Sequence, residues 1–264
     1  MIAPNVITGI SKEEGVGWAI VEKDYFLTLL LDSIANTPFL GKHLVFKGGT
    51  ALRKAYFRHY RYSEDLDFTL EKPLPENEIK ENLDHALEYL KKEYNADFRI
   101  TDFHSRKWFS DIKIQFIGLK GEKNTLTMDL MSDEVIADDS KDMIIMNPYY
   151  DKAFRVKTYS LEEIAAEKLR SLLQRTRVRD YYDVWYLLTR GQNVLDKKKV
   201  VSIFHKKVEY KKLPFSGAEQ LLRPDKLEAA KAYYHRQLGS HLRELPDFDE
   251  LDSQLRVAVL ALGL

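Results

Sequence analysis

The hydrophobic pattern predicts a region of strands and helices followed by a region of helices alone. Apolar residues return at helical spacing over residues 18–35, 50–58 and 75–94. Short apolar or alternating runs predict strands over residues 43–46, 65–68, 98–103, 111–119, 125–131 and 154–158. This order is typical of an α+β fold in which a mixed sheet has flanking helices.

The pattern changes at Ser160. Ser160 and Glu163 have the spacing of a capping box, in which each side chain accepts the backbone N–H of the other residue. Beyond them helices are predicted over residues 161–174, 179–190, 195–208, 224–238 and 248–262. We therefore expect two domains, residues 1–159 with the sheet and residues 160–264 with helices.

Composition excludes several kinds of chemistry. The chain has no cysteine, so disulfides, thiolate zinc sites and cysteine nucleophiles are excluded. Lys+Arg and Asp+Glu are balanced at 41 each, so an anionic partner must be bound by a local patch. The longest apolar run, near residues 25–34, is interrupted by polar residues and is too short to span a bilayer. No secretory signal is recognisable, and a cytoplasmic protein without a membrane partner is expected.

Two consecutive glycines stand between a predicted strand and a predicted helix. Gly48 and Gly49 let the backbone bend sharply and approach a ligand without a Cβ in the way. The helix that follows points its free N–H groups and its positive dipole end at the same space, which suits a phosphate. Thr50 is able to cap this helix or to donate its hydroxyl to a phosphate oxygen. A simple turn with a capping threonine is the alternative.

Asp65 and Asp67 flank Leu66 in the next predicted strand. Because side chains alternate across a strand, both carboxylates leave one face, about 6–7 Å apart. Carboxylates at this separation repel each other, and a divalent cation between them removes the repulsion. Only one helix and a turn separate them from the glycines, so we expect them beside the glycine turn. Two solvated acids at a strand end are the alternative.

A third carboxylate is expected to complete a metal site. Asp129 lies in the run from Leu126 to Met131, where apolar residues alternate with threonine and acid. Asp111 and Asp133 meet the same requirement. We favour Asp129 because its flanking residues are the most typical of a core strand.

Lys168 lies on the stripe that the helix over residues 161–174 is expected to bury. A lysine there either extends its ammonium to solvent along its apolar stem or meets an anion such as a triphosphate. The next helix carries Asp180 and Asp183 on one face. A structural pair between Asp180 and the preceding Arg179 is the simpler interpretation for that acid.

A basic stretch joins these two helices. Its five cations are Lys168, Arg170, Arg175, Arg177 and Arg179, in a chain of zero formal net charge. Such a stretch is able to attract RNA, and Tyr181 and Tyr182 are able to stack on bases. Arginines that pair with nearby acids in a solvated turn are the alternative.

Several of these segments resemble the AbiEii/AbiGii type of nucleotidyltransferases, toxins of toxin–antitoxin and phage-defence systems that are related to the MenT toxins. The resemblance covers about residues 20–190 and rests on motifs in order: Val21–Phe26, Val45–Tyr56, Tyr62–Phe68, Glu163–Lys168 and Arg179–Trp185. Residues after 190 carry no further match.

The resemblance implies a polymerase-β-like nucleotidyltransferase core over residues 1–159 and a helical domain over residues 160–264 that completes the active site. The nucleotide-binding residues it implies are Lys47, Gly48, Gly49, Thr50 and Lys168. Magnesium (or manganese) would be held by Asp65, Asp67 and Asp129. The catalytic residues would be Asp65, Asp67, Lys168, Asp183 and, able to exchange roles with Asp183, Asp180.

The implied activity is transfer of a nucleoside monophosphate from a nucleoside triphosphate to an acceptor hydroxyl, with release of pyrophosphate. The MenT relationship suggests tRNA as the acceptor, and a toxin implies a cognate antitoxin. An enzyme that modifies a protein or an antibiotic is one alternative. A non-catalytic nucleotide-binding module is the other, although the intact Asp65, Asp67 and Lys168 argue against it.

Overall fold

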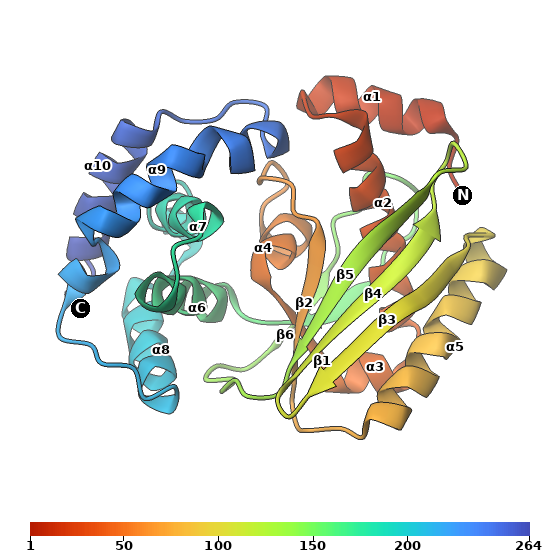
Figure 1. The fold of residues 1–264 in the computed structure, drawn as a ribbon, viewed down its shortest axis with the longest axis horizontal. Coiled ribbons are helices and arrows are strands. Elements are labelled where there is room, and N and C mark those ends of the chain that lie inside the picture. The colour runs from red at the N-terminus through yellow and green to blue at the C-terminus, as the bar shows by residue number, and fades with distance from the viewer. The chain divides into compact units, whose positions relative to one another are not determined.

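The computed structural model describes residues 1–264, which form two compact units. Unit 1 consists of Met1–Asp133 and Ser140–Thr158, and unit 2 consists of Glu134–Asp139 and Tyr159–Leu264. All strands belong to unit 1, and helices are the regular elements of unit 2 (Figure 1).

A seven-stranded mixed sheet forms the centre of unit 1, in the order β3-β4-β5-β2-β1-β7-β6. The strands are β1 Leu44–Lys47, β2 Asp65–Leu70, β3 Phe98–Arg106, β4 Phe109–Ile117, β5 Lys123–Met131, β6 Lys141–Ile144 and β7 Arg155–Thr158. The β2–β5 and β1–β7 pairs are parallel, and the other pairs are antiparallel. A mixed sheet with flanking helices, as the hydrophobic pattern predicts, is confirmed.

Alternation gives the sheet one apolar, buried face. Along β5, Leu126, Met128 and Leu130 are buried and the residues between them are partly exposed. Helix α2 (Trp18–Ala35) covers this face, since the Phe26 ring stacks on the Phe116 ring of β4 with centroids 4.1 Å apart. Helix α5 (Glu76–Tyr94) packs beside α2 and against β3. The opposite face of the same strands carries polar side chains.

Helix α2 has the bounds that the hydrophobic pattern predicts, and it is buried around most of its circumference. A helix in this position has no polar face to hold charged residues in water. Asp24 and Asp32, only 1% and 0% exposed, therefore lie inside unit 1. Each needs a cation beside it, because an unpaired charge in an apolar interior is very costly.

Among the α-helices and strands, the hydrophobic pattern misses three: α1 (Pro4–Glu14), α3 (Pro38–His43) and β6. Helix α1 buries only Ile7, and β6 is an edge strand of mostly exposed residues, so neither has a clear apolar period. The helix predicted over residues 50–58 consists of α4 (Gly48–Ala51) and a π-helical turn (Leu52–Tyr56). The N–H of Phe57 closes that turn on the carbonyl of Leu52 at 2.8 Å.

Unit 2 is built from five longer helices, as the pattern beyond Ser160 predicts. They are α6 Leu161–Gln174, α7 Val178–Thr189, α8 Lys197–Tyr210, α9 Pro224–Leu238 and α10 Phe248–Leu260. Helix α6 packs against α7 and α8, and α7 packs against α9 and α10. Their buried stripes form the core of this unit.

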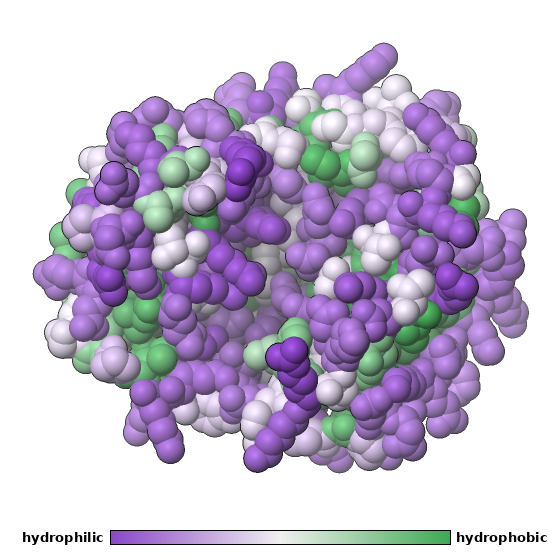
Figure 2. All heavy atoms as spheres, in the orientation of Figure 1, coloured by the Kyte–Doolittle hydropathy of each residue, from purple (hydrophilic) through white to green (hydrophobic).

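One face of the chain is mainly polar. Hydrophilic side chains dominate the face shown in Figure 2, where hydrophobic side chains occur in scattered groups. No helix combines the length and the apolar character that crossing a membrane requires.

Only half of the predicted capping box forms at the start of α6. The Ser160 hydroxyl accepts the N–H of Glu163 at 3.1 Å, which confirms the first half. The carboxylate of Glu163 does not return to Ser160. It accepts the N–H of Ala137 at 3.1 Å and pairs with Lys207 at 2.5 Å, with both charged side chains fully buried. The Glu163 carboxylate thus pairs with the buried Lys207 instead of accepting the backbone N–H of Ser160.

Charged groups of α6 and α8 hold the segment Glu134–Asp139 in unit 2. The ammonium of Lys207 donates to the Val135 carbonyl at 3.0 Å. Two ion pairs add to this, Arg170–Glu134 at 3.0 Å and Lys199–Asp138 at 2.8 Å. The segment lies within the range 1–159 expected for the sheet domain, yet its contacts are those of the helical unit.

We predict that Lys207→Met strongly destabilises the protein. The change leaves the Glu163 carboxylate charged at a fully buried position. The free energy of unfolding in urea should fall by roughly 3–5 kcal/mol. The double variant Lys207→Met/Glu163→Gln, which removes both charges of the fully buried pair, should regain part of the loss. Equal unfolding free energies for Lys207→Met and the wild type would contradict the prediction.

Candidate active site

Strand β1 ends in a turn that requires glycine. Gly48 has a φ of +80°, in the left-handed region, and a Cβ on it would overlap the carboxylate of Asp67. A Cβ on Gly49 would stand 2.5 Å from Nη2 of Arg61. The glycine pair therefore lets the backbone approach the acid-bearing strand β2 closely.

Thr50 ties the glycine turn to β2. Its buried hydroxyl donates to the backbone carbonyl of Asp65 at 2.5 Å. Helix α4 has no side-chain cap, so the capping role considered for Thr50 is wrong. The hydrogen bond fixes the start of α4 beside the first acid of the strand.

Three of the candidate residues stand side by side on the polar face of the sheet. Lys47 of β1 is in register with Asp67 of β2, and Asp67 is in register with Asp129 of β5. Residues in register on neighbouring strands project from the same face, with strands about 5 Å apart. Asp65 lies on this face too, in register with Thr127. The glycine turn and the three acids thus belong to one part of unit 1.

Asp111 continues this row, because it is in register with Asp129 on β4. Asp133 follows the end of β5 and has no register partner in the sheet. No group of three or more His, Asp or Glu side chains is arranged to hold a metal ion. The row therefore places Asp67, Asp129 and Asp111 on three neighbouring strands, and Asp67 and Asp129 are the pair nearest the glycine turn. Magnesium commonly takes one or two carboxylates and fills its other positions with water and substrate phosphates, so this donor set fits it.

In unit 2, Lys168 is directed at two aspartates of α7. Its ammonium lies 2.9 Å from a carboxylate oxygen of Asp180 and 2.7 Å from one of Asp183. The lysine side chain is 12% exposed, and the two aspartates are 2% and 0% exposed. Lys168 therefore does not extend to solvent, and α6 and α7 are joined by an ion cluster.

Arg175 completes this cluster, with Nε 2.7 Å from Asp180. The arginine beside Asp180 is thus Arg175, and the pairing considered with Arg179 is wrong. Burial raises the pKa of Asp180, but Lys168 and Arg175 outweigh burial and hold the pKa below its usual value. Asp180 is therefore ionised at neutral pH.

The basic stretch between α6 and α7 is largely used inside unit 2. Arg170 is buried and pairs with Glu134, and Arg175 pairs with Asp180. Arg177 is exposed. The proposed stacking of Tyr181 and Tyr182 on bases is wrong, because these side chains are 0% and 4% exposed. Their rings serve the core of unit 2.

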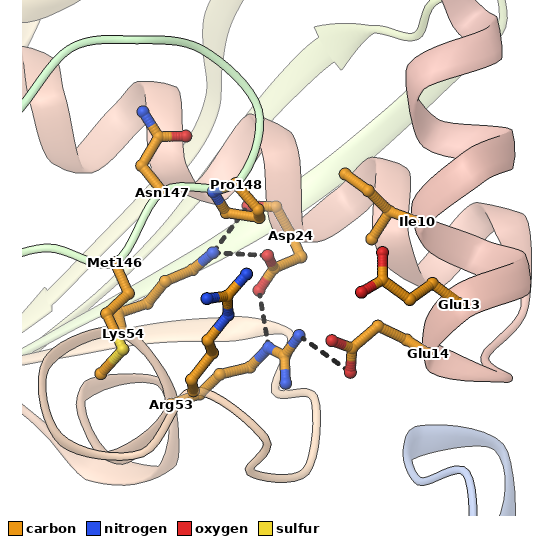
Figure 3. A pocket seen from close by; sticks show the side chains of 10 residues that line it. Ile10, Glu13, Glu14, Asp24, Arg53, Lys54, Met146, Asn147 and Pro148 are labelled. Carbon is orange, nitrogen blue, oxygen red and sulfur yellow. Dashed lines mark hydrogen bonds and ion pairs between the residues drawn. The ribbon is translucent and has the colours of Figure 1, made fainter.

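A buried charge cluster lies where the sequence pattern assigns no role. Asp24 of α2 pairs with Lys54 of the π turn, and Nε of Arg53 stands 3.7 Å from its other oxygen. These side chains meet at the wall of a cavity of about 350 Å³, which Glu14 and Asn147 also line (Figure 3). The available signal was an acid within an apolar helix, and two cations after the glycine turn.

Comparisons with known proteins identify the family and the fold of the chain. The family profile described as "Nucleotidyl transferase AbiEii toxin, Type IV TA system" matches residues 29–254, well past residue 190, where the recognisable motifs end. MenT4, a nucleotidyltransferase toxin from Mycobacterium tuberculosis H37Rv, has a similar structure with a TM-score of 0.73 and 17% sequence identity. The match covers 100% of this chain and 90% of that one, and at this identity it shows a shared fold. No curated protein matches the chain in sequence.

We predict that Lys168→Met lowers the free energy of unfolding by roughly 3 kcal/mol or more at pH 7, since it leaves two buried carboxylates without their lysine. The pKa of Asp180 is lowered from 3.8 on folding, so its pairing stabilises the protein above that pH. The stabilisation is lost as the pH falls through the lowered pKa. The difference in the free energy of unfolding between the wild type and Lys168→Met should therefore become smaller below about pH 4.

The control for this measurement is Lys231→Met in the same unit. Lys231 pairs with Asp249 at the surface, with side chains 52% and 71% exposed, so its loss should change stability little. Urea denaturation of the three proteins from pH 3 to pH 8 provides the comparison. A Lys168→Met variant as stable as Lys231→Met at pH 7 would rule out the ion cluster as a stabilising feature.

Proposed function

The chain belongs to the AbiEii family of nucleotidyltransferase toxins, and we propose that it transfers a nucleoside monophosphate from a nucleoside triphosphate to an RNA hydroxyl, with tRNA as the acceptor. The cofactor in this proposal is magnesium or manganese, and the partner is a cognate antitoxin. The observation that carries the proposal is the packing of Gly48 against the carboxylate of Asp67. A backbone turn without side chains and a row of acids are thereby neighbours.

The glycine turn is the proposed phosphate site. Because Gly48 and Gly49 have no Cβ, no side chain of their own shields their backbone N–H groups. Lys47 precedes the two glycines. A phosphate on this turn would lie beside Asp67, so one cation would be able to contact both. This closeness supports a joint metal and triphosphate site.

Asp67 and Asp129 would hold the metal through their carboxylate oxygens, and Asp65 is proposed as a further ligand from the same face. A divalent cation supplies charge that neutralises the triphosphate and lowers the pKa of an acceptor hydroxyl. Asp67 and Asp129 are in register on neighbouring strands, which supports a shared ion. Asp65 follows the same face, and its backbone is held by Thr50.

In the reaction, the acceptor oxygen bonds to the α-phosphorus while the bond to the bridging oxygen breaks. Pyrophosphate leaves, and the hydroxyl proton passes to water or to a base. Phosphoryl transfer depends mainly on positioning and charge stabilisation, so few protein groups suffice. Lys47 would neutralise phosphate charge beside the glycine turn. In unit 2, Asp180 and Asp183 hold the ammonium of Lys168, the cation proposed as a further nucleotide contact.

The surface that supports an RNA acceptor lies mainly on α8. Residues 196–212 contain seven lysines and two acids. Three of these lysines, Lys199, Lys207 and Lys211, form ion pairs within unit 2. Lys198, Lys206 and Lys212 are exposed, and the Tyr210 ring, 46% exposed, lies 5.7 Å from the Lys211 ammonium. Exposed lysines with an aromatic side chain suit a phosphate backbone and its bases.

We predict that Asp67→Asn abolishes transfer. The change keeps the size of the side chain but removes the charge that a divalent cation requires, so activity should fall by at least about a hundredfold. The assay is transfer of label from each nucleoside triphosphate to total RNA with magnesium. Asp84→Asn, on the exposed side of α5, is the matched control and should keep full activity. Full activity of Asp67→Asn would refute the metal assignment.

The same assay identifies the third carboxylate. Asp129→Asn should reduce transfer strongly, whereas Asp111→Asn, its register neighbour, should have a small effect. The reverse result would assign the role to Asp111.

We predict that Lys198→Glu/Lys206→Glu weakens RNA binding and makes it less sensitive to salt. The slope of log affinity against log salt should become shallower by about 0.7 for each lost contact with single-stranded RNA. Lys91→Glu/Lys92→Glu, on exposed positions of α5, makes the same change of net charge and should leave the slope unchanged. Arg177→Glu tests the basic stretch without breaking the Arg175–Asp180 pair.

The affinity for nucleoside triphosphate, measured in parallel, should stay the same in the variants Lys198→Glu/Lys206→Glu, Lys91→Glu/Lys92→Glu and Arg177→Glu. Wild-type salt slopes in both Lys198→Glu/Lys206→Glu and Arg177→Glu would remove RNA as the acceptor. A protein or small-molecule hydroxyl would then take its place.

A further inference from the structure

The cluster around Asp24 contacts the part of the chain that connects the glycine turn to Asp65. Asp24 is 1% exposed, and the cations that reach it, Lys54 and Arg53, are 2% and 7% exposed. Both cations belong to the π turn, which continues the helix that starts at Gly48. Figure 3 shows the Lys54 and Arg53 side chains extending from that turn toward Asp24.

Lys54 is bound from several sides. It donates to the Asp24 carboxylate and, at 2.8 Å, to the hydroxyl of Thr28, one turn further along α2. Its backbone carbonyl accepts the N–H of Met146 at 2.7 Å. The hydroxyl of Tyr149 donates to the same Asp24 oxygen as Lys54, at 2.5 Å. The π turn is thus fixed to α2 and to the segment before β7.

Arg53 connects this cluster to the segment that leads into β2. Its guanidinium donates to the carbonyl of Tyr60 and lies 3.4 Å from the centre of the Tyr62 ring. Tyr60 and Tyr62 are themselves buried. Asp65, the first acid of β2, follows three residues after Tyr62. Asp24 therefore contacts both cations of the helix that begins at the glycine turn, and Arg53, which also lies 3.9 Å from Glu14, reaches the approach to the acids.

The charges at this position favour a fixed geometry. Burial raises the pKa of Asp24, but Lys54 and Arg53 outweigh burial and keep the pKa below its usual value. Burial lowers the pKa of Lys54, and Asp24 opposes that effect. Without the carboxylate, two buried cations would repel each other next to the π turn.

We propose that Asp24 is a positioning residue for nucleotidyl transfer, which acts through Lys54 and Arg53 to fix the glycine turn relative to Asp65 and Asp67. The proposal rests on the function proposed above for those residues. Asp24 touches none of them and so is not a catalytic residue. Displacements of about 1 Å at a reacting centre can cost about a hundredfold in rate, which makes such an anchor consequential.

The same helix provides a control for a purely structural role. Asp32 is also buried, and it pairs with Lys152 at 2.8 Å and accepts from Tyr89 of α5 at 3.2 Å. Its partners lie outside the segments from Gly48 to Asp67. Loss of either charge should lower stability, but only the loss of Asp24 should disturb the candidate site.

The test compares Asp24→Asn with Asp32→Asn in the full-length protein. Thermal unfolding, kcat and KM for labelled triphosphate with total RNA and magnesium, and hydrogen exchange of the backbone amides are measured well below both melting temperatures. We expect both variants to melt earlier. Asp24→Asn should lose about 10- to 100-fold in kcat/KM and exchange faster over residues 48–67. Asp32→Asn should keep wild-type kcat/KM and exchange faster in α5.

Asp24→Glu, which restores the charge on a longer side chain, should recover part of the lost activity. If Asp24→Asn fails to fold, Arg53→Lys replaces it, because lysine keeps the charge but lacks the guanidinium that contacts Tyr60 and Tyr62. Wild-type kcat and KM in Asp24→Asn, or in Arg53→Lys, would overturn the positioning role while leaving the proposed function intact. A wild-type protein that transfers no nucleotide would overturn the proposed function, and this role with it.

Discussion

A carboxylate buried in a protein needs a cation within a few ångströms, and in this chain that need joins segments that are far apart in the sequence. Asp24 meets Lys54, and Asp32 meets Lys152, both from the apolar helix α2. In unit 2, Glu163 meets Lys207 at 2.5 Å. Each pair fixes an irregular segment that apolar packing alone would leave loosely defined. The π turn and the segment Glu134–Asp139 owe their places to such pairs.

This constraint suits the chemistry of the family. In nucleotidyl transfer the protein itself does little covalent chemistry. The rate depends on how the phosphates, the metal and the acceptor are positioned. Backbone turns and short strands are soft positioning elements unless something rigid holds them. Two contacts hold the glycine turn and the start of β2 in place. The Thr50 hydroxyl donates to the Asp65 carbonyl, and the Arg53 guanidinium packs on the Tyr62 ring. In unit 2, Lys168 is held in the same way, by ion pairs with Asp180 and Asp183.

The sequence predicts much of this because hydrophobic period is a local property. The bounds of α2 and α6 agree with the pattern, and the alternation around Asp65 and Asp129 indicates strands with outward acids. The register that aligns Lys47, Asp67 and Asp129 depends on strand order, which alternation does not encode. The partner of Lys168 is likewise set by how α6 meets α7. A periodic stripe shows that a lysine is buried, but it does not show which acid faces it.

The path of the chain through residues 134–158 has a consequence for how the gene can be divided. The segment Glu134–Asp139 belongs to unit 2, yet β6 and β7, which follow it, complete the sheet of unit 1. Cutting the chain at any single position therefore leaves at least one of the two units incomplete. During synthesis the sheet gains its last two strands only after the ribosome has passed residue 158, with part of the helical unit already made. Recombination that exchanges the helical unit between relatives would need three junctions, so the two units are expected to be inherited together.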